Sequence, residues 1–188
     1  ITSNATCTPD FNWMNNQEQS SPCLVVAYIL AVCIGDSKLH CCLPVEWGDE
    51  YDPPNATTIT PCYCSWSCYN LMMACTLCQY INASLSLWSY FSQVCPSTYS
   101  DKYFPTSYAL FANEMIPYWA SINSTTWPFG IFSVLQAQDY ANKGMQDLTP
   151  SVSSTSKLSN LGPIVGSIVS GTTFIILAFG VYYLYRHQ

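Results

Sequence analysis

Apolar positions in the first half of the chain gather in three stretches, and the first spans Ser20 to Gly35 (SSPCLVVAYILAVCIG). Ser21 is a preferred N-cap residue, Pro22 suits the first helical position, and Gly35 is a typical stop. The apolar run of about a dozen residues is shorter than the roughly 20 that a membrane span needs. We therefore expect a buried core helix with an inner face at helical spacing: Cys23, Ala27, Leu30 and Ile34, with Cys33 at its edge.

The second stretch, residues 61–78 (PCYCSWSCYNLMMACTLC), predicts the helix around which the chain is organised. If this helix begins near Ser65, its cysteines and one leucine fall within about 80° of one another: Cys64, Cys68, Leu71, Cys75 and Cys78. Sulfurs on one face of one helix cannot all bond to each other. We therefore expect disulfides from this stripe to other segments, with the six upstream cysteines as the natural partners.

The third stretch, residues 85–95 (LSLWSYFSQVC), predicts a short helix capped by Ser84 or Ser86, with an inner side formed by Trp88, Phe91 and Cys95. Residues 36–61 are rich in Pro, Gly, Asp and Asn and predict irregular loops. The whole pattern favours a mainly α fold, namely a small disulfide-stapled helical ectodomain with long irregular loops plus one transmembrane helix.

Residues 96–146 contain no cysteine but many aromatic residues, and prolines at 96, 105, 117 and 128 exclude a long helix. We predict an extended strap that packs its aromatic side chains onto a cysteine-rich helical module, residues 1–95. Within the strap, residues 136–144 (QAQDYANKG) predict a short final helix.

Three further segments are predicted after the strap. Residues 147–162 have the Ser/Thr-rich composition of a flexible stalk. Residues 163–185 form an uncharged apolar stretch that is about 35 Å long as a helix, enough for a hydrocarbon core of about 30 Å. Residues 186–188 begin a basic cytoplasmic tail. Small residues predict a helix-packing face in the membrane: Gly162, Gly166, Ser170 and Gly171.

Eleven cysteines occur together with four Asn-x-Ser/Thr sequons, at Asn4, Asn55, Asn82 and Asn123, and this combination indicates the oxidising secretory pathway. We expect a signal peptide to have been removed before Ile1. The predicted location is the plasma membrane or a secretory-pathway membrane, with the N-terminal domain extracellular or lumenal and a short cytoplasmic C-terminus.

The cysteine count also predicts an unpaired thiol. Because eleven is odd, one cysteine is expected to be unpaired or bonded to another chain, and the pairing of the others stays open. The disulfide candidates are Cys7, Cys23, Cys33, Cys41, Cys42, Cys62, Cys64, Cys68, Cys75, Cys78 and Cys95.

Composition narrows the classes of ligand. The net charge is −6, and five basic residues scattered along the chain give no footprint for nucleic acid. Aromatic residues make up 15% of the chain, and we favour packing as their role. The alternative is that exposed rings stack on sugars, for which the candidates are Trp47, Tyr51, Trp119 and Trp127.

Two groups between residues 40 and 52 carry candidate metal chemistry. His40-Cys41-Cys42 would suit a metal ion, but adjacent cysteines in an oxidised domain favour two separate disulfides. Carboxylates that would suit calcium match no defined calcium loop and favour a solvated acidic turn: Glu46, Asp49, Glu50 and Asp52. We predict no metal and no cofactor.

A catalytic set is not evident in the sequence. His40 is the one histidine of the expected ectodomain, so any Ser–His or Cys–His pair depends on it. A pair of Glu46 or Glu50 with Glu114 for glycoside hydrolysis has no support in the spacing. The carboxylates of Asp101 and Asp139 are isolated, and no Gly-rich phosphate loop occurs. We predict a protein that is not an enzyme.

Several motifs follow one another in a definite order: SSPCLVVAYILAVC, PCYCSWSCYNLMMACTLCQ, LWSYFSQVC, YFP and MIPYWASINSTTW, then the stalk and the membrane helix. Over about residues 20–185 this order resembles a group of cysteine-rich single-pass (type I) surface proteins of mushroom-forming fungi. The resemblance implies a fungal membrane glycoprotein and brings no activity with it. Cys68 and the Cys41-Cys42 pair depart from the group's pattern, so its bridges cannot be copied to this chain.

These expectations favour a non-enzymatic, single-pass cell-surface glycoprotein. Its ectodomain and membrane helix would serve protein–protein interaction, as a homo-oligomer or as an accessory subunit of a membrane assembly. The expected partners are the lipid bilayer and other membrane or surface proteins, including a second copy. A carbohydrate-binding or wall-sensing receptor is the alternative.

Overall fold

Short helices and turns predominate in the computed structural model, which describes residues 1–46 and 48–151. The elements in chain order, where η marks a 3-10 helix, are β1 (Thr2–Ser3), η1 (Pro9–Met14), α1 (Pro22–Ile34), β2 (His40–Cys41), α2 (Trp66–Gln79), α3 (Trp88–Phe91), α4 (Ser97–Ser100), η2 (Phe111–Asn113), η3 (Tyr118–Ser121), η4 (Ser124–Thr126), η5 (Pro128–Gly130) and α5 (Val134–Asn142). The mainly α, disulfide-rich fold is therefore confirmed for this part of the chain.

Several predictions concern residues outside those ranges. Trp47, the stalk beyond Ser151, the membrane helix at 163–185 and the tail at 186–188 all lie outside the described residues, as do Gly162, Gly166, Ser170 and Gly171. Among the residues that the structure describes, no helix has both the length and the apolar character needed to cross a membrane.

The α1 helix begins and ends where its sequence predicts. The Ser21 hydroxyl accepts a hydrogen bond from the Leu24 N–H at 3.3 Å, which satisfies a donor that the first turn leaves free. Gly35 ends the helix in the left-handed conformation, with φ of 70°, which glycine adopts without strain. One predicted inner-face residue is misplaced, because Ile34 in the last turn is 56% exposed.

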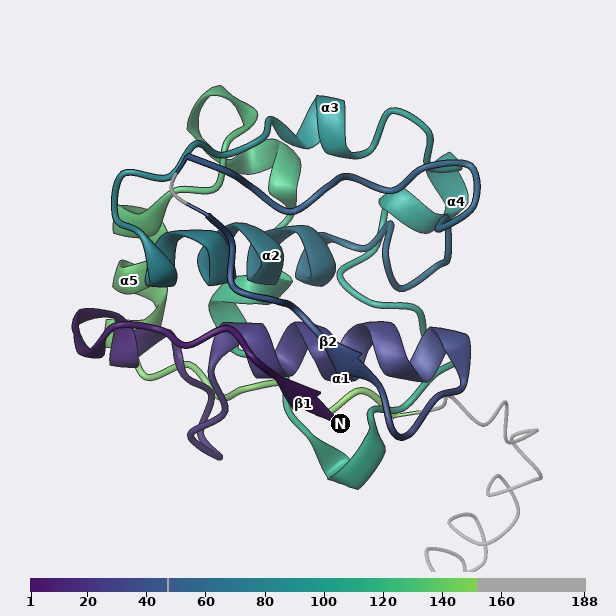
Figure 1. Ribbon diagram of the computed structural model, residues 1–188, viewed down its shortest axis with the longest axis horizontal. Coiled ribbons are helices and arrows are strands. Elements are labelled where there is room, and N and C mark those ends of the chain that lie inside the picture. The colour runs from purple at the N-terminus through teal and green to yellow at the C-terminus, as the bar shows by residue number, and fades with distance from the viewer. Residues whose placement is uncertain (47, 152–188) are drawn as a thin grey trace, which may run out of the picture. The chain divides into compact units, whose positions relative to one another are not determined.

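The α2 helix is buried on all sides, and the other segments surround it (Figure 1). It starts at the predicted position, since the Ser65 hydroxyl caps it by accepting from the Cys68 N–H at 3.3 Å. Every residue from Ser67 to Cys78 is buried, so its polar side chains need partners inside the protein. Thr76, for example, donates to the Met72 carbonyl at 3.0 Å.

Four disulfides tie the surrounding segments to the two long helices. Cys23–Cys75 and Cys33–Cys62 join opposite ends of α1 and α2, so the helices run antiparallel. Cys7–Cys78 anchors the N-terminal arm, and Cys64–Cys95 anchors the segment after α3. The expectation of upstream partners is wrong for Cys64, whose partner Cys95 lies downstream. At the start of the N-terminal arm, β1 pairs in parallel with β2, with Thr2 opposite His40.

The segment after α4 wraps the helical pair through short 3-10 turns and α5, and it belongs to the same compact unit as residues 1–95. Its aromatic side chains are largely buried, including Phe104, Trp119, Trp127 and Phe132. The buried side chain of Asn70 on α2 holds this segment. Its amide donates to the carbonyls of Ala120 and Ile122 at 3.0 and 2.9 Å, and its oxygen accepts from Trp127 Nε1 at 2.8 Å.

Candidate functional site

Three cysteines form no disulfide, whereas the odd cysteine count predicts a single unpaired one. They are Cys41, Cys42 and Cys68. The prediction that Cys41 and Cys42 enter two separate disulfides is therefore wrong. Cys68 lies in the buried stripe of α2, with its sulfur 3.8 Å from the Met72 sulfur. Burial disfavours the charged thiolate, so the pKa of Cys68 is raised well above its ordinary value.

Cys41 and Cys42 are adjacent but have opposite environments. Cys42 is buried and takes a left-handed backbone conformation, with φ of 60°, which a residue other than glycine adopts at a cost in energy. The Cys42 thiol donates a hydrogen bond to the Cys41 sulfur, and this bond lowers the pKa of Cys41. The same bond and burial raise the pKa of Cys42. The pair therefore releases its first proton from Cys41, the half-buried member.

The half-buried Cys41 thiol lines an open groove of about 320 Å³, which we call the Cys41 groove. Its walls come from the end of α1, from β2 and from the loop before α2. Most of the lining is apolar or hydroxyl-bearing: Leu30, Ile34, Leu39, His40, Cys41, Thr57, Thr58, Thr60 and Tyr63. Beside these residues in sequence, Leu43 is 71% exposed. His40 is exposed and its Nδ1 lies 2.7 Å from the Thr2 hydroxyl.

A second hollow, also of about 320 Å³, lies where η1, η3 and the end of α5 meet, and we call it the amide cavity. Five carboxamide side chains from one short segment line it: Asn12, Asn15, Asn16, Gln17 and Gln19. Three aromatic side chains and one carboxylate complete the polar and aromatic lining: Trp13, Tyr118, Trp119 and Asp147. Figure 1 shows the purple N-terminal turn next to α5, which brings these distant segments together.

Buried hydrogen bonds fix the walls of the amide cavity. The Glu114 carboxylate is buried and accepts bonds from the Asn16 amide and, at 3.0 Å, from the Ser20 hydroxyl. The Asp147 carboxylate accepts from the Gln17 and Tyr118 N–H groups at 2.7 and 3.1 Å, while burial raises the pKa of Asp147. Glu114 is thus a positioning group bonded to Asn16 and Ser20, whereas the Glu50 carboxylate bonds to Ser86.

The predicted sugar-stacking residues are not exposed platforms. Trp119 and Trp127 are each 2% exposed, because their rings pack against Phe132 in the core. Tyr51 is half-buried, and its hydroxyl donates to the Leu43 carbonyl at 2.8 Å. Burial raises the pKa of Tyr51 to about 12. The expectation of exposed stacking rings is therefore wrong for these three residues.

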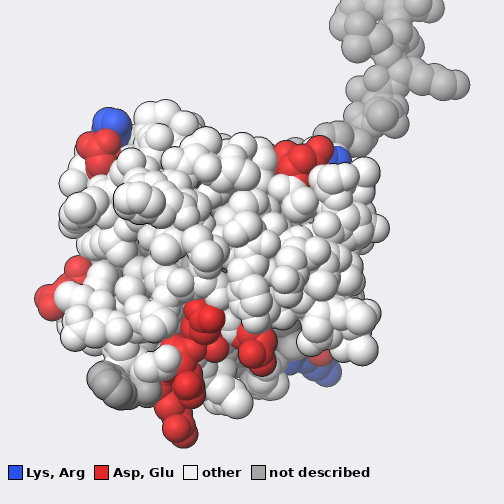
Figure 2. Space-filling model, turned by 90° about the horizontal axis from the view of Figure 1, so that it is seen from above, with Lys and Arg blue, Asp and Glu red and all other residues white. Residues whose placement is uncertain are grey.

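The four predicted calcium ligands do not converge. Figure 2 shows the largest group of acidic side chains in the lower part of a mostly uncharged face, with smaller charged groups around its edge. Glu46, Asp49 and Asp52 are exposed, while Glu50 is half-buried and accepts from the Ser86 hydroxyl at 2.7 Å. Within residues 1–46 and 48–151, these carboxylates form no group close enough to hold a metal ion.

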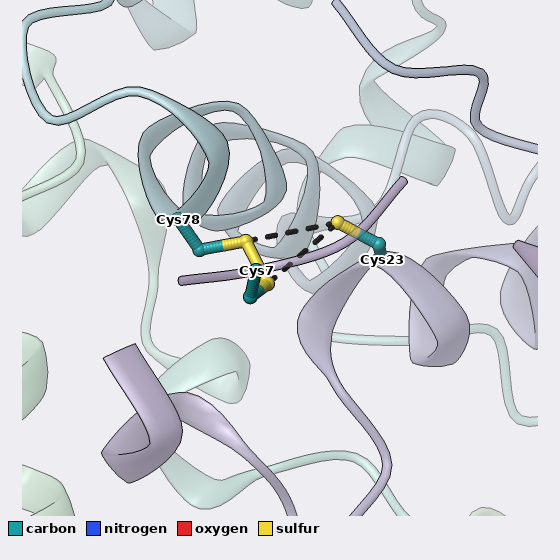
Figure 3. Close-up of side chains that lie close together, drawn as sticks. All are labelled: Cys7, Cys23 and Cys78. Atoms are coloured by element: carbon teal, nitrogen blue, oxygen red, sulfur yellow. Dashed lines mark hydrogen bonds between the residues drawn. A yellow bond between two sulfur atoms is a disulfide. The ribbon is translucent and has the colours of Figure 1, made fainter. Parts of the chain in front are cut away.

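One group of three sulfurs does lie within 4.8 Å, formed by Cys7, Cys23 and Cys78 (Figure 3). The Cys23 sulfur lies 4.0 Å from the Cys7 sulfur and 3.8 Å from the Cys78 sulfur. These are packing contacts, because disulfide sulfurs carry no proton and all three take part in Cys7–Cys78 or Cys23–Cys75. A metal needs thiolates, so this group has a structural role.

The sequons lie at the surface to different degrees. Asn4, Asn55 and Asn82 are exposed, and Asn123 is half-buried. In two of them the side-chain oxygen accepts from the Thr hydroxyl two residues later, at 2.7 Å for Asn55 and 2.9 Å for Asn123.

Sequence reasoning missed the amide cavity, although the density of Asn and Gln between residues 12 and 19 is a signal that could have found it.

Comparison with protein-family models, with curated proteins and with solved structures finds no match to this chain. The resemblance to fungal surface proteins therefore stays a prediction based on the order of the motifs.

Proposed function

We propose that this protein is a non-enzymatic, single-pass surface glycoprotein whose disulfide-linked unit binds another protein in a membrane assembly. The observation that carries the proposal is the Cys41 groove, which joins exposed apolar surface to an unpaired thiol. Contiguous exposed apolar surface beside polar groups marks interaction sites on proteins. A carbohydrate-binding role, the alternative function, does not depend on this groove.

The chemistry of the groove defines the partner. Its lining carries apolar and hydroxyl groups together with His40, and among the described residues it contains no lysine, arginine, aspartate or glutamate. A partner segment with uncharged, apolar side chains would remove Ile34, which is 56% exposed, from water. Because 56% of the Ile34 side chain is still exposed, its burial would contribute about 0.8–1.7 kcal/mol, a useful share of the binding free energy.

The rigidity of the groove supports the same role. Cys33–Cys62 joins the end of α1 to the loop before α2, and both segments contribute walls. A preformed surface loses little conformational entropy on binding, and this favours affinity.

Capture through Cys41 tests the proposal on the full chain in native membranes. A thiol-directed bifunctional crosslinker should produce a heavier band on a non-reducing gel, and Cys41→Ser should remove it. Differently tagged copies distinguish a homo-oligomer, which contains both tags, from an accessory subunit bonded to a protein of another mass.

A matched pair of variants checks the groove itself. Ile34→Asp places a charge in the groove and should lower partner recovery by about tenfold or more. Leu135→Asp changes an apolar residue on α5 that is 80% exposed and does not line the groove, so recovery should be unchanged. A folded protein that gives neither a crosslinked band nor a co-purifying partner would rule the proposal out.

A further inference from the structure

We propose that the amide cavity binds a neutral saccharide. The cavity is separate from the Cys41 groove, because the two share no lining residue. Its volume of about 320 Å³ lies at the small end of the range for ligand pockets, about 300–1,000 Å³. A ligand of one or a few sugar rings suits this size better than a long polymer lying across the surface.

The functional groups in the cavity match both faces of a sugar. A sugar ring presents hydroxyl groups that donate and accept, and carboxamides can do both. Asn12, Gln17 and Gln19 are exposed amides at its rim. A sugar ring also presents an apolar C–H face, and the half-buried rings of Trp13 and Tyr118 supply large apolar surfaces for it.

The charge of the cavity selects against anionic ligands. Its lining contains Asp147 but no lysine or arginine. Each oxygen of the Asp147 carboxylate accepts one backbone bond, and each retains a lone pair for a ligand hydroxyl. A phosphate or an acidic sugar would meet this carboxylate without a compensating cation, whereas a neutral sugar would donate to it.

One donor in a residue of the cavity wall has no hydrogen-bond partner among the described residues. Trp119 lines the cavity and is only 2% exposed. Its indole Nε1 has no hydrogen-bond partner among the described residues. A buried N–H without a partner destabilises a fold, because the group has lost its hydrogen bond to water. Because Nε1 itself is buried, a ligand hydroxyl would satisfy it only after a small movement of the neighbouring groups.

The walls are held in place before any ligand arrives. The loop with Asn15 and Gln17 is fixed by the bonds from Asn16 and Ser20 to Glu114, and Asp147 ties the same loop to η3. Gln19 has a positive φ of 63°, a conformation that this bonded loop maintains. Groups that are fixed before binding lose little entropy when a ligand binds.

Titration of the purified full chain with defined sugars tests this proposal. The probes are trimers of glucose and of N-acetylglucosamine, with trigalacturonic acid as the anionic comparison. Calorimetry should detect saturable binding of at least one neutral trimer with Kd of about 1 mM or tighter. Tryptophan emission of the chain should shift in parallel, and the anionic trimer should not bind.

Variants at the cavity keep the test decisive. Trp13→Ala should weaken binding about tenfold through loss of a stacking surface. Asn12→Ala changes an exposed residue that the fold tolerates, and it should weaken binding several-fold. Phe129→Ala changes a ring that is 93% exposed outside the cavity and should leave binding unchanged.

Two results would overturn the saccharide site. One is the lack of saturable binding of either neutral trimer at about 10 mM by chain that keeps its native circular dichroism. The other is binding that neither Trp13→Ala nor Asn12→Ala weakens. Ile34→Asp in the Cys41 groove should leave sugar binding intact, so failure here is distinguishable from failure of the protein-binding role.

Discussion

Asn70 uses all of its side-chain hydrogen-bonding capacity inside the protein. Its amide donates to two carbonyls of the strap, and its oxygen accepts from Trp127 Nε1 and, at 3.3 Å, from the Ser124 hydroxyl. One residue in the middle of α2 thus fixes the path of η3 and η4 across the helix. An apolar run around Asn70 predicts the helix but gives no sign of these partners.

We expect Asn70→Ala to lower the free energy of unfolding by about 3 kcal/mol or more, because it leaves several buried donors and acceptors without partners. Urea unfolding of the disulfide-intact protein measures the change. The control is Asn142→Ala at the exposed end of α5, which should alter stability by less than about 0.5 kcal/mol. Similar losses in the two variants would contradict the proposed role of Asn70.

The unpaired thiols make a second prediction at the scale of residues. Cys41 has a lowered pKa and is half-buried, whereas the pKa values of Cys42 and Cys68 are raised and both side chains are buried. Since the thiolate is the reactive form, iodoacetamide should modify Cys41 first in the native protein.

The pH dependence of this alkylation follows from the sign of the shift. The rate should rise with pH and reach half of its plateau below the pH of an ordinary thiol, because Cys41 ionises at lower pH. Cys42→Ala removes the donated hydrogen bond and should move the midpoint up. Peptide mass mapping identifies the modified residue, and modification of Cys68 first would contradict this arrangement.

Among the elements, those with local signals are predicted best. Ser21, Gly35 and Ser65 cap α1 and α2 through contacts within a few residues, so a sequence motif suffices. The buried face of α1 is predicted less well, because Ile34 lies beside the open Cys41 groove instead of the core. Periodicity indicates which residues share a face and says nothing about where neighbouring elements end.

The bridges between elements depend on contacts that are distant in sequence. Cys64 pairs with Cys95 because the chain turns back after α3, and no local pattern indicates this. The amide cavity escapes prediction for the same reason, since η1, η3 and the residues after α5 meet only in the fold. The abundance of amides between residues 12 and 19 is visible in the sequence, but Asp147 and Trp119 are not evident as their neighbours.

Removal of the bridge between the N-terminal arm and α2 should have a predictable cost. With Cys23–Cys75 intact, the loop that Cys7–Cys78 closes runs from Cys7 to Cys23, across that bridge to Cys75 and on to Cys78. Its two chain segments are only 16 and 3 residues long. The chain-entropy relation then gives about 3 kcal/mol, less than its sequence separation of 71 would give alone.

Cys7→Ser combined with Cys78→Ser should therefore lower the free energy of unfolding by about 3 kcal/mol, as measured by urea unfolding. Cys41→Ser is the matched control, because Cys41 belongs to no disulfide, and it should change stability by less than about 1 kcal/mol. If the double variant lost as little stability as the control, the arm would be held by packing and not by its bridge.

At the scale of the whole molecule, the described unit places different chemistry in separate regions. An apolar groove with a thiol lies at the end of α1, a polar cavity lies beside α5, and the acidic loop residues are mostly exposed. The helix α2 supports all of them from the centre. Composition alone indicated a protein that is poor in charged residues and rich in aromatic ones, and most of the described aromatic side chains lie in the core or pack against it.

The connectivity of the four bridges also sets an order for biosynthesis. Each bridge has its later cysteine at or beyond residue 62: Cys62, Cys75, Cys78 and Cys95. Because the ribosome adds residues from the N-terminus onward, no native bridge can close while only the arm, α1 and β2 have been made. Five thiols then wait without native partners: Cys7, Cys23, Cys33, Cys41 and Cys42. The timing with which α2 emerges therefore decides how many nascent chains avoid wrong bridges.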